Sequence, residues 1–217
     1  FVFFIVILAM LITSVIELPI PILGQTVRTK KPDYSDREAR AIGEIYGVSI
    51  LEEMHAGSDK RYKTRITVNM GGVIIPLFYA LYLLLFFNQD QMNGYTYTYT
   101  YTLPLLEITM ATLLMTLISY MVSEVKGGVG ILVPNYVGLF AIPIGPILAP
   151  PGLPIDQIAM VLIFVPAIFG ILIGMLVRLI TLRKEEVGSA FFNIGGTGSF
   201  YTVYLISFLT LMIANLI

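Results

Sequence analysis

The segment that decides the fold runs from Ile155 to Ile180 and reads IDQIAMVLIFVPAIFGILIGMLVRLI. It is apolar over more than the roughly 20 residues that a helix needs to cross the hydrocarbon core of a bilayer. Five further segments are similar: about Phe1–Leu23, Ile66–Phe87, Leu103–Val122, about Gly128–Leu148 and about Gly188–Ile217. Backbone amides in lipid must be bonded within their own segment, and these runs lack the alternation of barrel strands, so we expect about six transmembrane helices.

The composition of the whole chain favours the same class of protein. Of its 217 residues, 57% are hydrophobic and 12% are charged, against about 25% charged residues in a soluble domain. We therefore predict an all-α integral membrane protein with a single transmembrane domain over residues 1–217, and the lipid bilayer as its first partner. The net charge of −1 gives no basic excess, so nucleic acid is not an expected partner.

The basic residues predict the orientation. The segment Gln25–Arg65, between the first two spans, holds nine of the 13 Lys and Arg, and the others are Lys126 and three residues from Arg178 to Lys184. With six spans, all of them lie on one side, and Lys and Arg in short loops stay on the cytoplasmic side. We expect a multi-pass protein of the cell membrane in which residues 25–65 form a cytoplasmic loop or small subdomain and the C-terminus lies outside.

Two loops carry patterns of their own. In the first, Ser35–Glu38 fits a capping box that begins a short helix, and alternation at Tyr46–Ile50 and Arg61–Val68 indicates a β-hairpin. In the outer loop, Tyr95–Thr102 alternates Tyr with Thr. This repeat fits an aromatic belt at the headgroups, a strand that pairs with a partner protein, or a surface that stacks on carbohydrate.

Three polar, glycine-rich clusters lie at the cytoplasmic ends of the second, fourth and sixth spans, where these helices begin. Helix starts present unpaired amides with a partial positive charge, and Gly lets a ligand or another backbone come close. The candidate ligand-binding residues are Asn69, Gly71, Gly72, Asn135, Asn193, Gly195, Gly196 and Gly198. The alternative is that the small residues only let helices pack closely, as Gly170-x-x-x-Gly174 in the fifth span also suggests.

The fourth span differs from the others. Gly127–Pro154 holds six Gly and six Pro, too many for one straight helix. We expect this span to be kinked, broken or re-entrant. Broken helices occur at the binding sites of transporters, and also where neighbouring protein covers the break.

The sequence offers little for catalysis. Two acids lie inside the predicted spans, Glu17 near the cytoplasmic end of the first and Glu107 near the outer end of the third, so they cannot form a paired-carboxylate site. There is no cysteine and one histidine, His55, which excludes thiolate and multi-histidine metal sites. We predict no catalytic residue, no metal and no cofactor, which argues against an enzyme.

Several motifs resemble the membrane family known as domain of unknown function 1614. They are Thr13–Pro19, Val68–Pro76 running into Tyr79, Gly128–Pro134, Leu172–Gly174 and Asn193–Phe200. The resemblance spans most of the chain and implies a multi-pass protein of prokaryotes, largely archaea, without an assigned activity. The family has an acid two positions after the glycine matched by Gly174 and another after the phenylalanine matched by Phe200. Because Leu176 and Tyr201 stand there, no protease-like or ion-binding acid pair is implied.

Two functions fit these observations. We favour a non-catalytic accessory or scaffold subunit of a membrane complex, which would bind partner proteins through its helix faces and the Tyr95–Thr102 loop, because mid-membrane charge is scarce. The alternative is a small-solute or ion transporter or channel with a cytoplasm-facing polar pocket lined by the Asn and Gly clusters. A scaffold should expose one face of small residues outside the bundle, whereas a transporter should turn the three clusters toward one another around a cavity.

Overall fold

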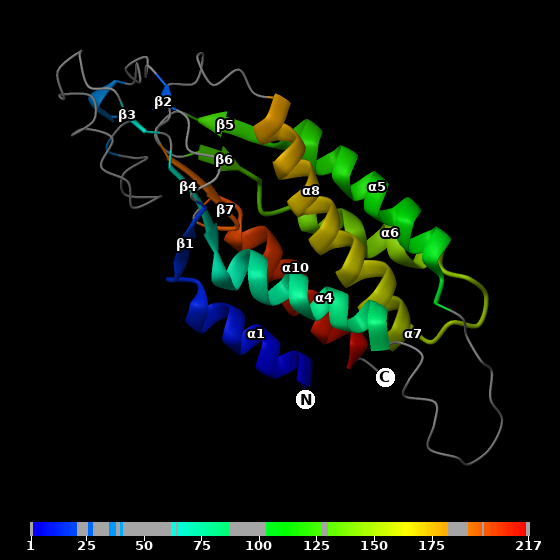
Figure 1. Cartoon of the computed structure of the whole chain (residues 1–217). Coiled ribbons are helices and arrows are strands. Elements are labelled where there is room, and N and C mark those ends of the chain that lie inside the picture. The colour runs from blue at the N-terminus through cyan, green and yellow to red at the C-terminus, as the bar shows by residue number, and fades with distance from the viewer. Residues whose placement is uncertain are drawn as a thin grey trace.

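The computed structural model describes residues 2–20, 26–27, 35–37, 40, 62–63, 65–86, 103–126, 130–181, 191–196 and 198–215. This part of the chain is mostly helical (Figure 1). The helical segments are α1 (Val2–Thr13), η2 with α4 (Met70–Ile74 and Ile75–Phe86), α5 (Leu105–Val122), η3 with α6 (Val137–Phe140 and Ala141–Leu148), α7 with η4 and α8 (Ile155–Gln157, Ile158–Phe164 and Val165–Thr181), and α10 (Phe200–Ala214).

Two of the described helices, Leu105–Val122 and Ile155–Thr181, are long and apolar enough to cross a membrane. Four more are apolar and shorter: Val2–Thr13, Met70–Phe86, Val137–Leu148 and Phe200–Ala214. All six lie within the segments that the sequence predicts as spans. The fourth segment is not one straight helix, because its first described residues form strand β6 (Gly130–Leu132) and the helix begins only at Val137.

Prolines shape two of the helical segments, Met70–Phe86 and Ile155–Thr181. Both η2 and η4 are π-helical turns, in which Ile75 N–H bonds to Met70 O and Val165 N–H bonds to Met160 O, five residues back. In each case a proline, Pro76 or Pro166, stands two positions after the π-helical turn ends. A proline cannot donate to the carbonyl four residues before it, and its ring collides with that carbonyl in a regular α-helix. The wider π turn gives the ring room and lets the helix continue.

Short strands replace the ends of several predicted spans, which corrects their boundaries. The first span was expected to reach Leu23, but α1 ends at Thr13 and strand β1 covers Glu17–Pro19. The second was expected to begin at Ile66, but strand β4 covers Arg65–Asn69. The sixth has strand β7 (Phe191–Ile194) before its helix. Apolar β-branched residues such as Ile66 and Val68 suit a strand as well as a helix in lipid, so hydrophobicity alone misplaces these ends.

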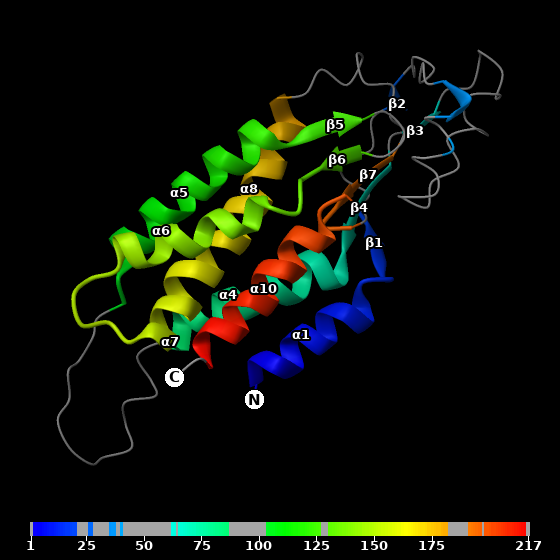
Figure 2. The same cartoon turned by 180° about the vertical axis from the view of Figure 1, so that it is seen from behind.

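A three-stranded sheet joins three helices at one end of the molecule. Its order is β1-β4-β7, with β1 antiparallel and β7 parallel to the central β4. β1 follows α1, β4 leads directly into η2 and α4, and β7 precedes α10 (Figure 2). Two smaller pairs lie at the same end: β2 (Thr26–Val27) with β3 (Tyr62–Lys63), and β5 (Glu124–Lys126) with β6 (Gly130–Leu132).

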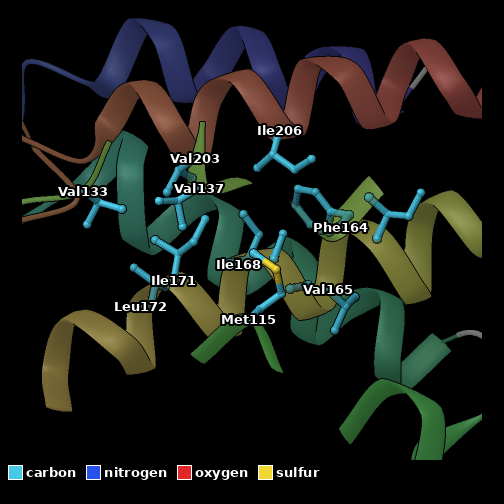
Figure 3. Packing of buried hydrophobic residues seen from close by; sticks show 14 of the residues in the cluster. Met115, Val133, Val137, Phe164, Val165, Ile168, Ile171, Leu172, Val203 and Ile206 are labelled. Carbon is cyan, nitrogen blue, oxygen red and sulfur yellow. The ribbon is translucent and has the colours of Figure 1, made fainter. Parts of the chain in front are cut away.

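The apolar core lies between the helices, with η4 and α8 at its centre (Figure 3). Phe164 of η4 is fully buried and packs edge-on against Phe3 and Tyr79, with ring centroids 5.1 and 5.6 Å away. On α8, Gly170 and Gly174 face α5, where a Cβ on Gly170 would lie 2.3 Å from Met115 Cβ. The small residues of the Gly170-x-x-x-Gly174 motif therefore bring two helices of the same chain together.

Parts of the predicted loops fall outside this description. Asp36, Arg37 and Arg40 are helical, which agrees with a short helix after Ser35. The predicted hairpin strand Tyr46–Ile50 and the outer loop Tyr95–Thr102 lie outside the described residues.

Candidate functional site

The three-stranded sheet has one polar face. In its register, Glu17 lies opposite Asn69, and Thr67 lies opposite Asn193. Paired residues share a face, and so do residues two apart on one strand. Glu17, Thr67, Asn69 and Asn193 therefore project from the same face, while Leu18, Val68 and Ile194 project from the other.

The carboxylate of Glu17 is held by two of these neighbours. Asn193 Nδ2 donates to Glu17 Oε1, and Thr67 Oγ1 donates to Glu17 Oε2 over 3.4 Å. Thr67 is 1% exposed and Asn193 is 4% exposed, whereas Glu17 is exposed. The carboxylate is thus fixed from the buried side and open on the other, where its remaining lone pairs can accept from a ligand.

Asn69 connects two helices. Its Oδ1 accepts from Gly72 N–H over 2.8 Å and caps the start of η2, while its Nδ2 donates to Ser14 O, just beyond α1. Both ends of the side-chain amide are therefore used. The capping bond satisfies an amide that would otherwise lack a partner at the helix start. Asn69 supports the site structurally and leaves ligand contacts to its neighbours.

Asn69→Ala should lower the free energy of unfolding by about 2 kcal/mol, because a helix cap and a buried hydrogen bond are lost together. Asn135→Ala is the matched control, since Asn135 is exposed and its loss should cost less than about 0.5 kcal/mol. Thermal unfolding of the two variants in detergent measures the difference. Equal unfolding midpoints for Asn69→Ala and Asn135→Ala would show that the Asn69 cap does not stabilise the protein.

The glycine clusters meet at this site, backbone against backbone. A Cβ on Gly72 would lie 1.8 Å from Gly195 O, and a Cβ on Gly71 would lie 2.1 Å from Met10 O. Gly198 O accepts from Val133 N–H over 2.8 Å, which joins the end of β6 to the loop before α10. Gly196 packs against the side-chain amide of Asn193. A Cβ on Gly196 would lie 2.0 Å from Asn193 Nδ2. These glycines serve close packing around the polar face.

Two predicted residues lie elsewhere. Asn135 is exposed between β6 and η3, off the sheet that carries Asn69 and Asn193. Glu107 is half-buried in the first turn of α5, at the end of the bundle opposite the sheet (Figure 1). Thr67 was not predicted as a site residue, although it lies in the alternating run Arg61–Val68, because it was also counted at the start of the second span. The strict alternation Arg65-Ile-Thr-Val-Asn69 is the signal that identifies it.

One polar atom of the site has no partner. Within the described residues, three buried side-chain atoms lack a hydrogen bond: Gln157 Oε1, Arg178 Nε and Asn193 Oδ1. An unsatisfied buried acceptor costs about 1–3 kcal/mol, so each one needs an explanation. Asn193 Oδ1 belongs to the same amide group that binds Glu17. No three His, Cys, Asp or Glu side chains gather into a metal site in the part of the chain that the structure describes.

These features define the class: an apolar, mostly helical protein, with helices able to cross a membrane and a small sheet at one end. Residues 11–213 match the family described as Protein of unknown function (DUF1614). The chain belongs to this family, which confirms the resemblance of its motifs. Neither a curated protein nor a solved structure matches the chain. Leu176 and Tyr201, at the two positions where the resemblance implies acids, are exposed on α8 and α10.

Proposed function

We propose that this protein is a six-span transporter or channel of the cell membrane that binds a small polar or cationic solute on the β1-β4-β7 sheet. One observation carries the proposal. Glu17 and Asn193, which are 176 positions apart in the chain, are joined by a hydrogen bond, and the polar face around them is fixed by buried side chains and open at Glu17.

The distribution of side chains supports a membrane location. Large apolar residues face outward on every helical segment, among them Leu85 at 72% and Ile180 at 80% exposure. Polar residues such as Ser119, Thr202 and Ser207 are buried. A soluble protein arranges these two classes the other way round. With the six helical segments in the bilayer, the distribution of Lys and Arg directs the sheet and residues 25–65 to the cytoplasm and the C-terminus outside.

The use of the glycines favours a transporter over a scaffold. A scaffold that docks partner proteins through small-residue faces needs those faces outside. Here Gly138 packs on Thr202 and Ile206, Gly145 packs on η4, and Gly170 and Gly174 pack on α5, all within the chain. Of the three clusters, those of Asn69 and Asn193 meet at the sheet, whereas Asn135 is exposed away from it. The meeting of the first two supports a solute-binding protein.

A line of hydroxyl groups leads inward from the sheet. Ser199, Thr202, Ser207 and Thr210 are all buried and recur on one side of α10 and the turn before it, at 3.6 residues per turn. Thr202 Oγ1 accepts from Gly138 N–H over 3.0 Å, and Ser207 and Thr210 donate to carbonyls of their own helix. Their remaining lone pairs offer a polar route along the helix.

The proposal is tested by ion uptake into liposomes that contain the purified protein, with labelled Na⁺, K⁺ and methylammonium as probes. We expect saturable uptake of at least one probe and a loss of about tenfold or more in Glu17→Gln, because an interaction worth about 1.4 kcal/mol changes a rate tenfold. Glu107→Gln, at the other end of the bundle, is the control and should keep its uptake. A wild-type protein that moves none of the probes, or a Glu17→Gln variant as active as wild type, would contradict transport through this site.

A further inference from the structure

We infer that the polar face of the sheet binds one monovalent alkali cation between the Glu17 carboxylate and Asn193 Oδ1. The role of this cation as a transported or coupling ion rests on the proposed function, whereas the site is inferred from the geometry of the side chains. It explains why a 96% buried amide keeps one of its two polar atoms without a protein partner, since Asn193 is 4% exposed.

The orientation of the Asn193 amide is fixed by its neighbour. Nδ2 donates to the Glu17 carboxylate, and reversing the amide would set two oxygen acceptors against each other. Oδ1 is therefore the free end, and it is bonded to the same carbon as Nδ2, beside the carboxylate. Any side chain at position 196 would cover this amide, because a Cβ there would lie 2.4 Å from Oδ1. Oδ1 itself is buried, so a small ion would reach it from the exposed side of Glu17.

The ligands available are hard oxygens. They are the Glu17 carboxylate, Asn193 Oδ1 and the hydroxyl of Thr67, which donates its proton to Glu17 and keeps its lone pairs. Carboxylate, amide and hydroxyl oxygens suit alkali and alkaline-earth ions and are poor ligands for soft metals. Water can complete the coordination from the open side of Glu17.

The charges of the groups around the site favour a ligand with a single positive charge. Glu17 contributes −1, the C-terminal end of α1 about −0.5, and the starts of η2 and α10 about +0.5 each, which leaves about −0.5. The two described side chains bonded to Glu17, those of Thr67 and Asn193, are uncharged. A divalent ion is normally held by more carboxylates than one. A monovalent cation therefore fits the balance better.

The test is a titration of the purified full chain with NaCl at constant ionic strength, with choline chloride as the replacement salt and KCl as the comparison. We expect a saturable rise of the thermal unfolding midpoint with Na⁺ or K⁺ over choline, because a ligand that binds only the folded state stabilises it. Glu17→Gln should abolish this rise, and Glu107→Gln should keep it. A midpoint that is the same in all three salts, or a Glu17→Gln variant that responds like wild type, would overturn the inference.

A second pair of variants covers the case in which Glu17→Gln does not fold. Thr67→Ser keeps the hydroxyl and Thr67→Val removes it, so we expect the cation Kd to rise about tenfold more in Thr67→Val than in Thr67→Ser. Equal affinities in the two variants would overturn the proposed ligand set. Cation binding without uptake into liposomes would support the cation site and contradict transport. Uptake without any response of the unfolding midpoint to cations would support transport and contradict the cation site.

Discussion

Gly72→Ala is expected to destroy the folded protein. The added methyl group would lie 1.8 Å from Gly195 O, whereas ordinary contacts of a Cβ are 3.4–4 Å. Gly195 has a φ of +75°, its N–H bonds to Ser199 Oγ over 3.0 Å, and it directly follows β7. The loop cannot withdraw without loosening the sheet. Overpacking against side chains costs about 1–3 kcal/mol, so against backbone we expect at least about 3 kcal/mol.

Yield of monodisperse protein in detergent and the thermal unfolding midpoint measure this effect. Leu85→Ala is the control on the same helical segment. It removes a larger group, but Leu85 is exposed, so the midpoint should change little. A Gly72→Ala protein that unfolds at the wild-type temperature would show that the two glycine clusters do not touch.

Gly174→Ala should separate α5 from α8, and Ser119→Gly should partly restore their contact. A Cβ on Gly174 would lie 2.6 Å from Ser119 Cβ and 2.7 Å from Ser119 Oγ. We expect a loss of about 2–3 kcal/mol for Gly174→Ala alone. Ser119→Gly removes both obstructing atoms, so the double variant should recover about 1 kcal/mol or more relative to the sum of the two single changes.

Gly170→Ala is the control for this double-mutant cycle. A Cβ at Gly170 would meet Met115 and Thr116, so Ser119→Gly should not rescue it. Unfolding of the three single and two double variants, set against wild type, gives the coupling energy for each pair. Equal rescue of Gly170→Ala and Gly174→Ala would mean that Ser119→Gly acts by loosening α5 in general.

Hydrophobicity predicted the helices well, because lipid and a helical core both require apolar side chains. The segment from Ile155 to Thr181 is an example. Hydrophobicity misplaced the ends of several helices. The polar residues Thr67 and Asn69 alternate with Ile66 and Val68, and this period of two marks a strand. The alternation at Arg61–Val68 predicted an extended segment, which β3 and β4 confirm. An apolar count over a wide window averages the alternation away, so the residues from Ile66 onward were also assigned to the second span.

The candidate site was predicted in part. Asn69, Asn193 and the glycines around them follow from their polarity at the helix starts, and Glu17 was selected as an acid within a span. Their meeting could not be predicted, since a parallel pairing of β4 with β7 joins segments more than a hundred residues apart. The sequence also gives no reason to separate Asn135 from the others. Its exposure depends on the turn between β6 and η3.

The order of the three strands has a consequence for synthesis of the protein. The central strand β4 emerges from the ribosome long before β7, so one of its edges stays unpaired until the chain has grown past Ile194. An unpaired strand edge is a template for wrong partners. Until then, Glu17 and Thr67 also lack Asn193 as a neighbour. The nascent chain therefore acquires its binding face only after β7 has been made and paired with β4.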